Sequence, residues 1–171
     1  MYLRNPKTDE FGRTEQPSAV SWPTMAMFPI GRFVGWLCGL RIGFSWVTLG
    51  NLFALITIPL TLCMYFWKVM PFVTRRYLLT DMRVIIQTGW SAQNGASVPL
   101  DGFDRIAAVV YSGQKFYRSA DLFFYDGDRI VFVLESVRFP DAFVKQVMLA
   151  RQTYILFRRT HQQQREGVVS R

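Results

Sequence analysis

The sequence predicts an α+β protein in which a single transmembrane helix precedes a small antiparallel β domain closed by an amphipathic helix. Three observations lead to this prediction. A long uncharged segment lies in the first half of the chain, short β-branched runs separated by turn signals follow it, and a helical period comes last. The 171 residues leave room for one such domain and a membrane element.

The segment of residues 42–67 is the strongest membrane signal. It reads IGFSWVTLGNLFALITIPLTLCMYFW, which is 26 residues without a charge. About 20 apolar residues suffice for a helix to cross the hydrocarbon core, and Pro59 is tolerated there as a kink. We therefore expect a transmembrane helix at 42–67, with Gly50 and Asn51 as candidate helix-contact positions.

Residues 25–41 precede this segment and contain an apolar stretch that is too short to cross a bilayer. We interpret them as an interfacial segment or as the first turns of the spanning helix. A rival interpretation is a two-helix hairpin from about Phe28 to Met70. The hairpin places Arg41 inside the hydrocarbon, at a cost of about 2.5–3.5 kcal/mol on insertion scales. One span is therefore favoured.

Basic residues beside the span predict its orientation. The N-terminal flank carries Arg32 and Arg41, whereas the C-terminal flank carries a larger set: Lys68, Arg75, Arg76 and Arg83. Lys and Arg accumulate in cytoplasmic loops. We therefore expect a single-pass protein of the cell inner membrane, with its C-terminal domain in the cytoplasm.

Residues 1–24 are polar, contain prolines at positions 6, 17 and 23, and lack the apolar core of a secretion signal. We interpret them as an extended arm without a hydrophobic core of its own, which becomes ordered on a partner. Large aromatic side chains in such an arm act as anchors. The candidate partner contacts are Tyr2, Phe11 and Trp22, together with Gly50 and Asn51 of the span.

Short apolar runs separated by turn signals predict a domain over residues 72–159. VTRRYLLT and RVIIQTG read as two strands around a tight turn, and an Asn-Gly pair at 94–95 marks a loop after them. A further strand is expected from Arg105 to Tyr111. ADLFFYDGDRIVFVLESV then reads as a hairpin, because its central Asp-Gly-Asp suits a tight turn between two apolar arms.

The pattern then changes to a helical period. Apolar residues recur every three or four positions on one face: Phe143, Val147, Ala150, Tyr154 and Phe157. Pro140 suits the first helical position, because its missing N–H is harmless there. We expect an amphipathic helix to Arg159 that closes a curved antiparallel sheet, followed by a polar tail at residues 160–171.

Four pieces of the predicted domain carry a family resemblance: YLLTDMRVIIQTG, SVPLDGFDRI, ADLFFYDG and RFPDAFVKQV. They resemble the bacterial pleckstrin-homology-like (bPH) domain of small membrane proteins, over residues 72–157, and Tyr-Leu-Leu-Thr-Asp-x-Arg is the most specific piece. The resemblance implies a PH-like sheet or partial barrel closed by the C-terminal helix. Family members often carry two helices before the domain, where this chain has one predicted span.

No constellation of catalytic residues emerges from the sequence. His161 is the single histidine, so a Ser–His pair or a metal–His site lacks partners. Most aspartates of the predicted domain occupy turn positions, where Asp hydrogen-bonds its own backbone. We therefore predict no enzymatic activity, no metal and no cofactor.

The basic residues give the chain a net charge of +8, which suits an anionic partner. Nucleic acid is not expected, because the span holds the domain at the membrane and no basic–aromatic motif is present. Juxtamembrane Lys and Arg each gain about 1 kcal/mol from anionic lipid. The candidate headgroup contacts are Lys68, Arg75, Arg76, Arg158 and Arg159. The other interpretation is that the basic residues next to the span only fix topology.

Two function classes follow from these features. The first is a membrane-anchored, non-enzymatic interaction module that serves as a scaffold or accessory subunit, with other membrane protein subunits and membrane lipids as partners. A respiratory, transport or photosynthetic assembly fits this class equally well. The alternative is a module that senses or organises anionic lipid headgroups.

Overall fold

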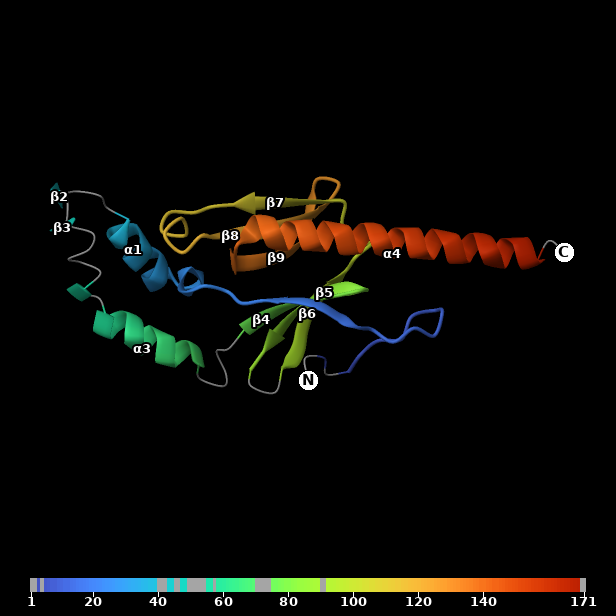
Figure 1. Cartoon of the computed structure of the whole chain (residues 1–171), viewed down its shortest axis with the longest axis horizontal. Coiled ribbons are helices and arrows are strands. Elements are labelled where there is room, and N and C mark those ends of the chain that lie inside the picture. Colours follow the sequence, from blue (N-terminus) through green and yellow to red (C-terminus); the bar gives the residue numbers. More distant parts are fainter. Residues whose placement is uncertain are drawn as a thin grey trace.

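The computed structural model describes residues 3, 5–39, 43–44, 47–48, 55–56, 58–69, 75–89 and 92–169. Two antiparallel sheets and a long C-terminal helix make up the domain, and two shorter helices lie at one end of it (Figure 1). The predicted α+β class with antiparallel strands and a C-terminal helix is confirmed. The described strands form separate sheets and not a closed barrel.

The first sheet has four strands in the order β1-β4-β5-β6. Its strands are β1 (Pro17–Ser21), β4 (Arg75–Thr80), β5 (Arg83–Thr88) and β6 (Gln93–Pro99). The predicted tight turn between β4 and β5 is closed by Thr80, whose hydroxyl accepts the Arg83 N–H (3.0 Å). The Asn-Gly pair expected in a loop lies instead inside β6, beside a register irregularity opposite β5.

The second sheet has three strands in the order β7-β8-β9. Its strands are β7 (Arg105–Val109), β8 (Ser119–Asp126) and β9 (Arg129–Arg138). The β8–β9 hairpin turns where the sequence predicts it. Gly127 has a positive φ of 60° in this turn, a conformation that glycine adopts without steric cost.

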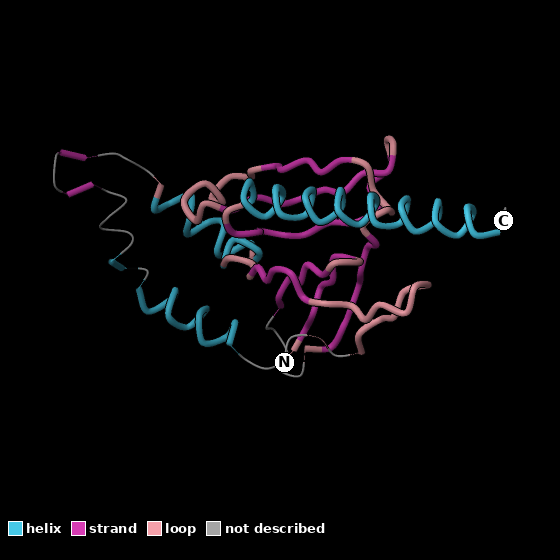
Figure 2. Tube along the Cα trace, turned by 45° about the vertical axis from the view of Figure 1, so that its right-hand side comes forward, coloured by secondary structure: helices cyan, strands magenta, loops and turns pink. Residues whose placement is uncertain are grey.

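Helix α4 (Pro140–Val169) covers the core and then continues past the strands (Figures 1 and 2). Phe143 and Val147 are buried, as the helical period predicts, and Tyr154 packs against the same cluster. The Arg151 guanidinium donates to the Phe103 carbonyl (2.8 Å) and so ties the helix to the β6–β7 connection. The helix runs beyond the predicted end at Arg159, and most of the expected polar tail is helical.

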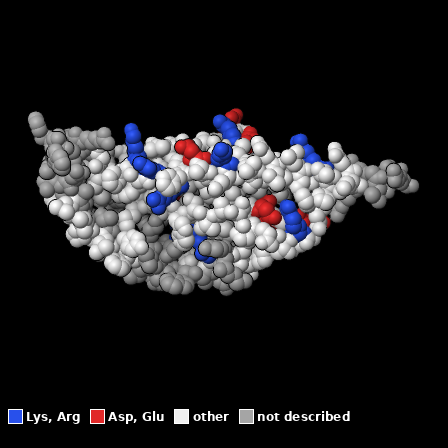
Figure 3. All heavy atoms as spheres, in the orientation of Figure 1, with Lys and Arg blue, Asp and Glu red and all other residues white. Residues whose placement is uncertain are grey.

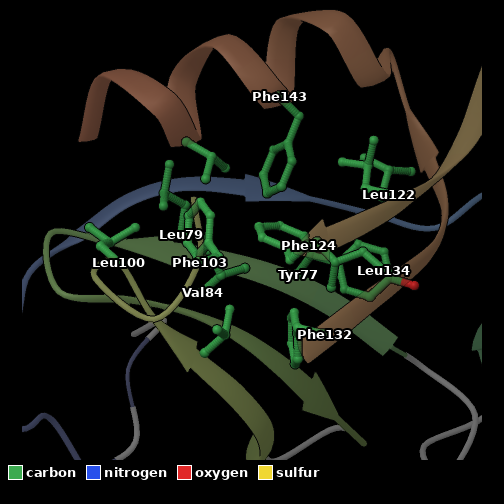
Figure 4. Packing of buried hydrophobic residues seen from close by; sticks show 13 residues of the cluster. Tyr77, Leu79, Val84, Leu100, Phe103, Leu122, Phe124, Phe132, Leu134 and Phe143 are labelled. Atoms are coloured by element: carbon green, nitrogen blue, oxygen red, sulfur yellow. The ribbon is translucent and has the colours of Figure 1, made fainter. Parts of the chain in front are cut away.

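The hydrophobic core lies between the two sheets and α4, and strands of both sheets contribute to it (Figure 4). Phe124 is its centre: its ring meets Phe103 edge-on at 5.0 Å between centroids and Phe132 at 5.6 Å. Aromatic pairs in this geometry stabilise by about 0.5–1.5 kcal/mol beyond their buried area.

Part of the extended arm predicted at residues 1–24 forms a strand of the first sheet, β1. β1 pairs antiparallel with β4, and Glu15 just before it is buried. The composition is too polar to form a core alone, but the strand takes its hydrogen bonds from β4 and its packing from the existing sheet. The sheet therefore includes a strand that lies before the expected domain start at residue 72, because β1 begins at Pro17.

The transmembrane helix predicted over residues 42–67 is not one continuous helix. Part of that range lies outside the described residues, but β2 (Gly43–Phe44) and β3 (Val47–Thr48) pair as short antiparallel strands, and α3 spans Ile58–Val69. Pro59 lies within the described helix α3, and the kink expected there stays a prediction. No helix in the described part of the chain combines the length and apolarity needed to span a membrane.

The pairing of β1 with β4 favours a different arrangement from the expected single pass. These strands flank the predicted span in the sequence, yet Ser21 lies opposite Tyr77 in one sheet. A chain that crosses a bilayer once between them would place them on opposite faces. The intervening segment therefore begins and ends on the same side of any membrane it enters.

Candidate interaction site

Helix α1 (Pro29–Cys38) is fixed to the domain by an ion pair between Arg32 and Asp121 of β8. Their atoms Nη2 and Oδ2 lie 3.1 Å apart, and Arg32 Nε also donates to the Ala26 carbonyl (2.8 Å). Ala26 belongs to the single turn η1 (Met25–Met27), which is followed directly by α1. Within the segment predicted as interfacial, residues 29–38 thus form a helix that is attached to the sheet.

Asp121 is the centre of a buried polar network. Its Oδ1 accepts hydrogen bonds from the Gln114 side-chain amide and from the Ser136 N–H (2.7 Å). Gln114 Oε1 in turn accepts the Tyr111 N–H (2.8 Å). Because the carboxylate is occupied by a guanidinium, an amide and a backbone N–H, it serves to position α1 and the 110–118 loop.

Two glycines allow α1 and this loop to approach closely. A Cβ on Gly35 would lie 2.5 Å from the Gly113 carbonyl oxygen and 2.5 Å from the Tyr117 ring. A Cβ on Gly113, whose φ is +84°, would lie 1.9 Å from the Arg32 carbonyl oxygen. The two backbones are in direct contact, so any side chain here would force α1 away from the domain.

The outer surface of this region is apolar. On α1, Phe33 is 60% exposed and Trp36 is 47% exposed. Three groups of large hydrophobic residues are exposed at this end of the molecule: Ile30, Phe33 and Trp36 on α1; Val110, Tyr111 and Phe116 in the loop; and Ile58, Leu62, Tyr65 and Phe66 on α3. On the face shown in Figure 3, charged groups are small and separated by uncharged surface. We call these ten residues the apolar surface; such surfaces mark contact with a membrane or another protein.

A second buried ion pair holds the N-terminal segment. Arg83 Nε and Nη2 donate to the two Glu15 carboxylate oxygens at 2.8 and 2.9 Å. Burial alone raises the pKa of Glu15, but hydrogen bonds from Arg83, the Lys7 N–H and the Thr80 hydroxyl outweigh it and hold that pKa below its ordinary value. From the sequence alone Arg83 is interpreted as a topology signal, because its partner lies 68 residues away and gives no local sign.

The predicted headgroup residues lie on two separate elements. Arg75 is 3.5 Å from Glu135, and the Arg76 Nε donates to Gln87 (2.7 Å), both at the start of β4. The others are on α4, where Arg158 pairs with Asp101 and lies 3.9 Å from Glu10, while Arg159 is exposed. The Lys68 side chain lies outside the described part of α3. The contacts of the four described arginines do not bring them into one cationic site.

Among the predicted partner contacts, Trp22 is exposed, whereas Phe11 packs within the chain against Phe157 and His161. Tyr2, Gly50 and Asn51 lie outside the described residues. Phe11 therefore helps to attach the N-terminal segment to α4. Within the described residues, no cluster of three or more His, Cys, Asp or Glu side chains is arranged to hold a metal ion.

Comparison with protein families decides the identity of this fold. The family model of the bacterial PH domain matches residues 29–151 of the chain. The chain belongs to the bacterial PH domain family. The matched range begins at the first residue of α1 and includes that helix, whereas β1 and Glu15 precede it. No curated protein and no solved structure matches the chain. A PH-like domain indicates a non-catalytic interaction module.

Proposed function

We propose that this bacterial PH domain protein is a membrane-associated interaction module without catalytic activity, which serves as a scaffold or accessory subunit of a larger membrane assembly. The observation that carries the proposal is the apolar surface on α1, α3 and the 110–118 loop. The domain core is complete without these side chains, so their exposure does not serve folding of the domain.

The attachment of α1 supports this proposal. Arg32, Asp121 and the Gly35–Gly113 contact hold the helix against the sheet while Phe33 and Trp36 point outward. A helix that is already fixed loses little conformational entropy when its outer face becomes covered. The apolar surface is therefore preorganised for a membrane or for a subunit within one.

The β1–β4 pairing restricts how the protein meets the bilayer. Because both flanks of residues 22–74 belong to one sheet, any part of this segment that enters the bilayer must return to the side from which it entered. A two-helix hairpin or a segment lying in the interface satisfies this condition. Basic residues near the segment favour the cytoplasmic face of the inner membrane for the domain.

Co-purification from mild detergent tests the accessory role. We expect the tagged full chain to retain specific membrane subunits, and Phe33→Ser/Trp36→Ser to lose them. The matched control is Leu149→Ser/Leu156→Ser, which removes the same kind of exposed side chain from α4. Equal retention by both double variants would contradict the proposed surface.

A lipid-sensing role is the second candidate function, and one observation favours it. Two arginines without a described carboxylate partner line a pocket beside aromatic side chains. This pocket lies away from the headgroup residues predicted from the sequence.

A further inference from the structure

The pocket lies where the chain enters η1, beside the end of the 110–118 loop and the junction of β9 with α4. It has a volume of about 520 Å³. Its lining residues are Trp22, Pro23, Thr24, Phe116, Tyr117, Arg118, Arg138 and Phe139. Two cationic side chains and several rings thus share one open hollow.

The walls of the pocket are joined by backbone hydrogen bonds. The Phe139 N–H donates to the Arg118 carbonyl (3.0 Å), and the Thr24 N–H donates to the Ser136 carbonyl (2.9 Å). Pro23 also forms a bridge with Val137. The three segments that carry Trp22, Arg118 and Arg138 are therefore held in fixed relation.

The backbone around the pocket is unusual. Arg118, Ser136 and Phe139 all have positive φ, at 51°, 51° and 49°. Residues other than glycine adopt this conformation at a cost, and such residues cluster at ligand sites and switches. Arg118 and Arg138, which lie at or next to these positions, line the same pocket.

The charge of the pocket is unbalanced. None of its lining residues is acidic, and no described carboxylate forms an ion pair with Arg118 or Arg138. The Arg138 guanidinium carbon lies 4.9 Å from the centroid of the Phe139 ring, as in a cation–π contact. By contrast, Arg32, Arg75, Arg83 and Arg158 each have a carboxylate partner.

We propose that this pocket binds the phosphate of an anionic phospholipid headgroup through Arg118 and Arg138, while Trp22, Phe116 and Phe139 rest in the interfacial layer. Guanidinium groups bind phosphate oxygens in a fork geometry. Trp and other rings favour the headgroup depth of a bilayer. All three rings are about half exposed, at 47%, 52% and 49%.

A lipid fits this site better than an acidic peptide for two reasons. The rings beside the arginines are exposed and surround the charge, as in an interfacial anchor. Phe116 lines the pocket and is also one of the ten residues of the apolar surface, so one approach to the bilayer brings the pocket and that surface into contact. The inference rests on the membrane association proposed above, and it adds a site and a lipid class.

Vesicle flotation of the full chain, diluted from mild detergent, tests the site. We compare phosphatidylcholine vesicles with vesicles that also contain phosphatidylglycerol, for wild type and for Arg118→Gln/Arg138→Gln. The matched control is Arg105→Gln/Arg129→Gln, which removes two arginines from the opposite end of the same sheet. Thermal unfolding of each variant checks that it is folded.

We expect phosphatidylglycerol to raise wild-type partitioning, and the pocket variant to lose roughly 20- to 30-fold of it. Its binding to phosphatidylcholine and the partitioning of the control should stay unchanged. The inference is overturned if the phosphatidylglycerol gain survives in the pocket variant, or if the control loses it equally. It is also overturned if the pocket variant loses only a co-purifying protein, which would assign the site to an acidic partner.

The two proposals fail in different ways in this assay. Wild type that floats with phosphatidylcholine but gains nothing from phosphatidylglycerol contradicts the pocket and leaves the membrane association standing. Wild type that floats only with phosphatidylglycerol, in a manner that needs Arg118 and Arg138, supports the pocket and contradicts association through the apolar surface.

Discussion

Arg83 and Glu15 lie 68 residues apart in the chain and form a buried two-point ion pair. Glu15 precedes β1 and Arg83 begins β5, so the pair connects the segment before α1 to the sheet that follows α3. The pair bears directly on membrane topology, because it joins the chain before residues 22–74 to the chain after them.

Removal of Glu15 should destabilise the domain strongly. Glu15→Ala leaves the Arg83 guanidinium buried without its partner, which costs about 3–5 kcal/mol. Glu10→Ala is the control. Glu10 is exposed and forms an ion pair with Arg158 at 3.9 Å, and surface pairs of this kind contribute about 0–1 kcal/mol to stability. Chemical unfolding of the full chain in detergent measures both, and similar midpoints for the two variants would contradict the assigned role of Glu15.

The same carboxylate predicts an acid sensitivity. The folded-state pKa of Glu15 is lowered, so its contribution to stability is present above the unfolded value of about 4.3 and is lost as pH falls through the folded value. Wild type should therefore lose stability on acidification more steeply than Glu15→Gln, which has no carboxylate to protonate. Unfolding midpoints across pH 3–7 measure the difference. Parallel curves for the two proteins would refute it.

The buried face of α4 predicts a contrast between neighbouring positions. Phe143 is 4% exposed and packs in the core, so Phe143→Ala should destabilise the domain by about 3–5 kcal/mol. Lys145 is exposed on the same helix, and Lys145→Ala should change stability by no more than about 0.5 kcal/mol. Unfolding midpoints of the two variants check the helix register, and equal losses would show that the face is misassigned.

Membrane topology gives a prediction that differs from single-pass insertion. Reporters fused before Met1 and after Arg171 should lie on the same side of the membrane, because β1 pairs with β4. The basic residues favour the cytoplasmic side for both. Reporters on opposite sides would be incompatible with the β1–β4 pairing.

Much of the domain could be predicted from local sequence. The β8–β9 hairpin carries an Asp-Gly turn between apolar arms, and the α4 face carries a helical period, so each element is specified by residues near one another. β1 could not be predicted in this way. Its sequence, PSAVS, is too short and too weakly apolar to show an alternating pattern, and it becomes a strand because β4 offers an open edge.

The candidate sites could not be predicted from local sequence either, because they depend on contacts between residues far apart in the chain. Arg32 and Arg83 looked like topology signals until Asp121 and Glu15, both distant in sequence, were seen beside them. The pocket at Arg118 and Arg138 depends on positive φ at ordinary residues, and no glycine marks those positions in the chain. An uncharged stretch indicates apolar surroundings, but it does not specify whether the chain crosses the bilayer or returns.

Fractionation of cells that express the full chain is the most direct test of the central claim, which is membrane association through the apolar surface. Apolar contacts are not screened by salt, whereas attraction between exposed charges fades beyond about 8 Å at physiological ionic strength. We predict that the protein sediments with membranes, remains there after a high-salt wash and is released by detergent. Recovery of the folded protein in the supernatant without detergent would contradict the account.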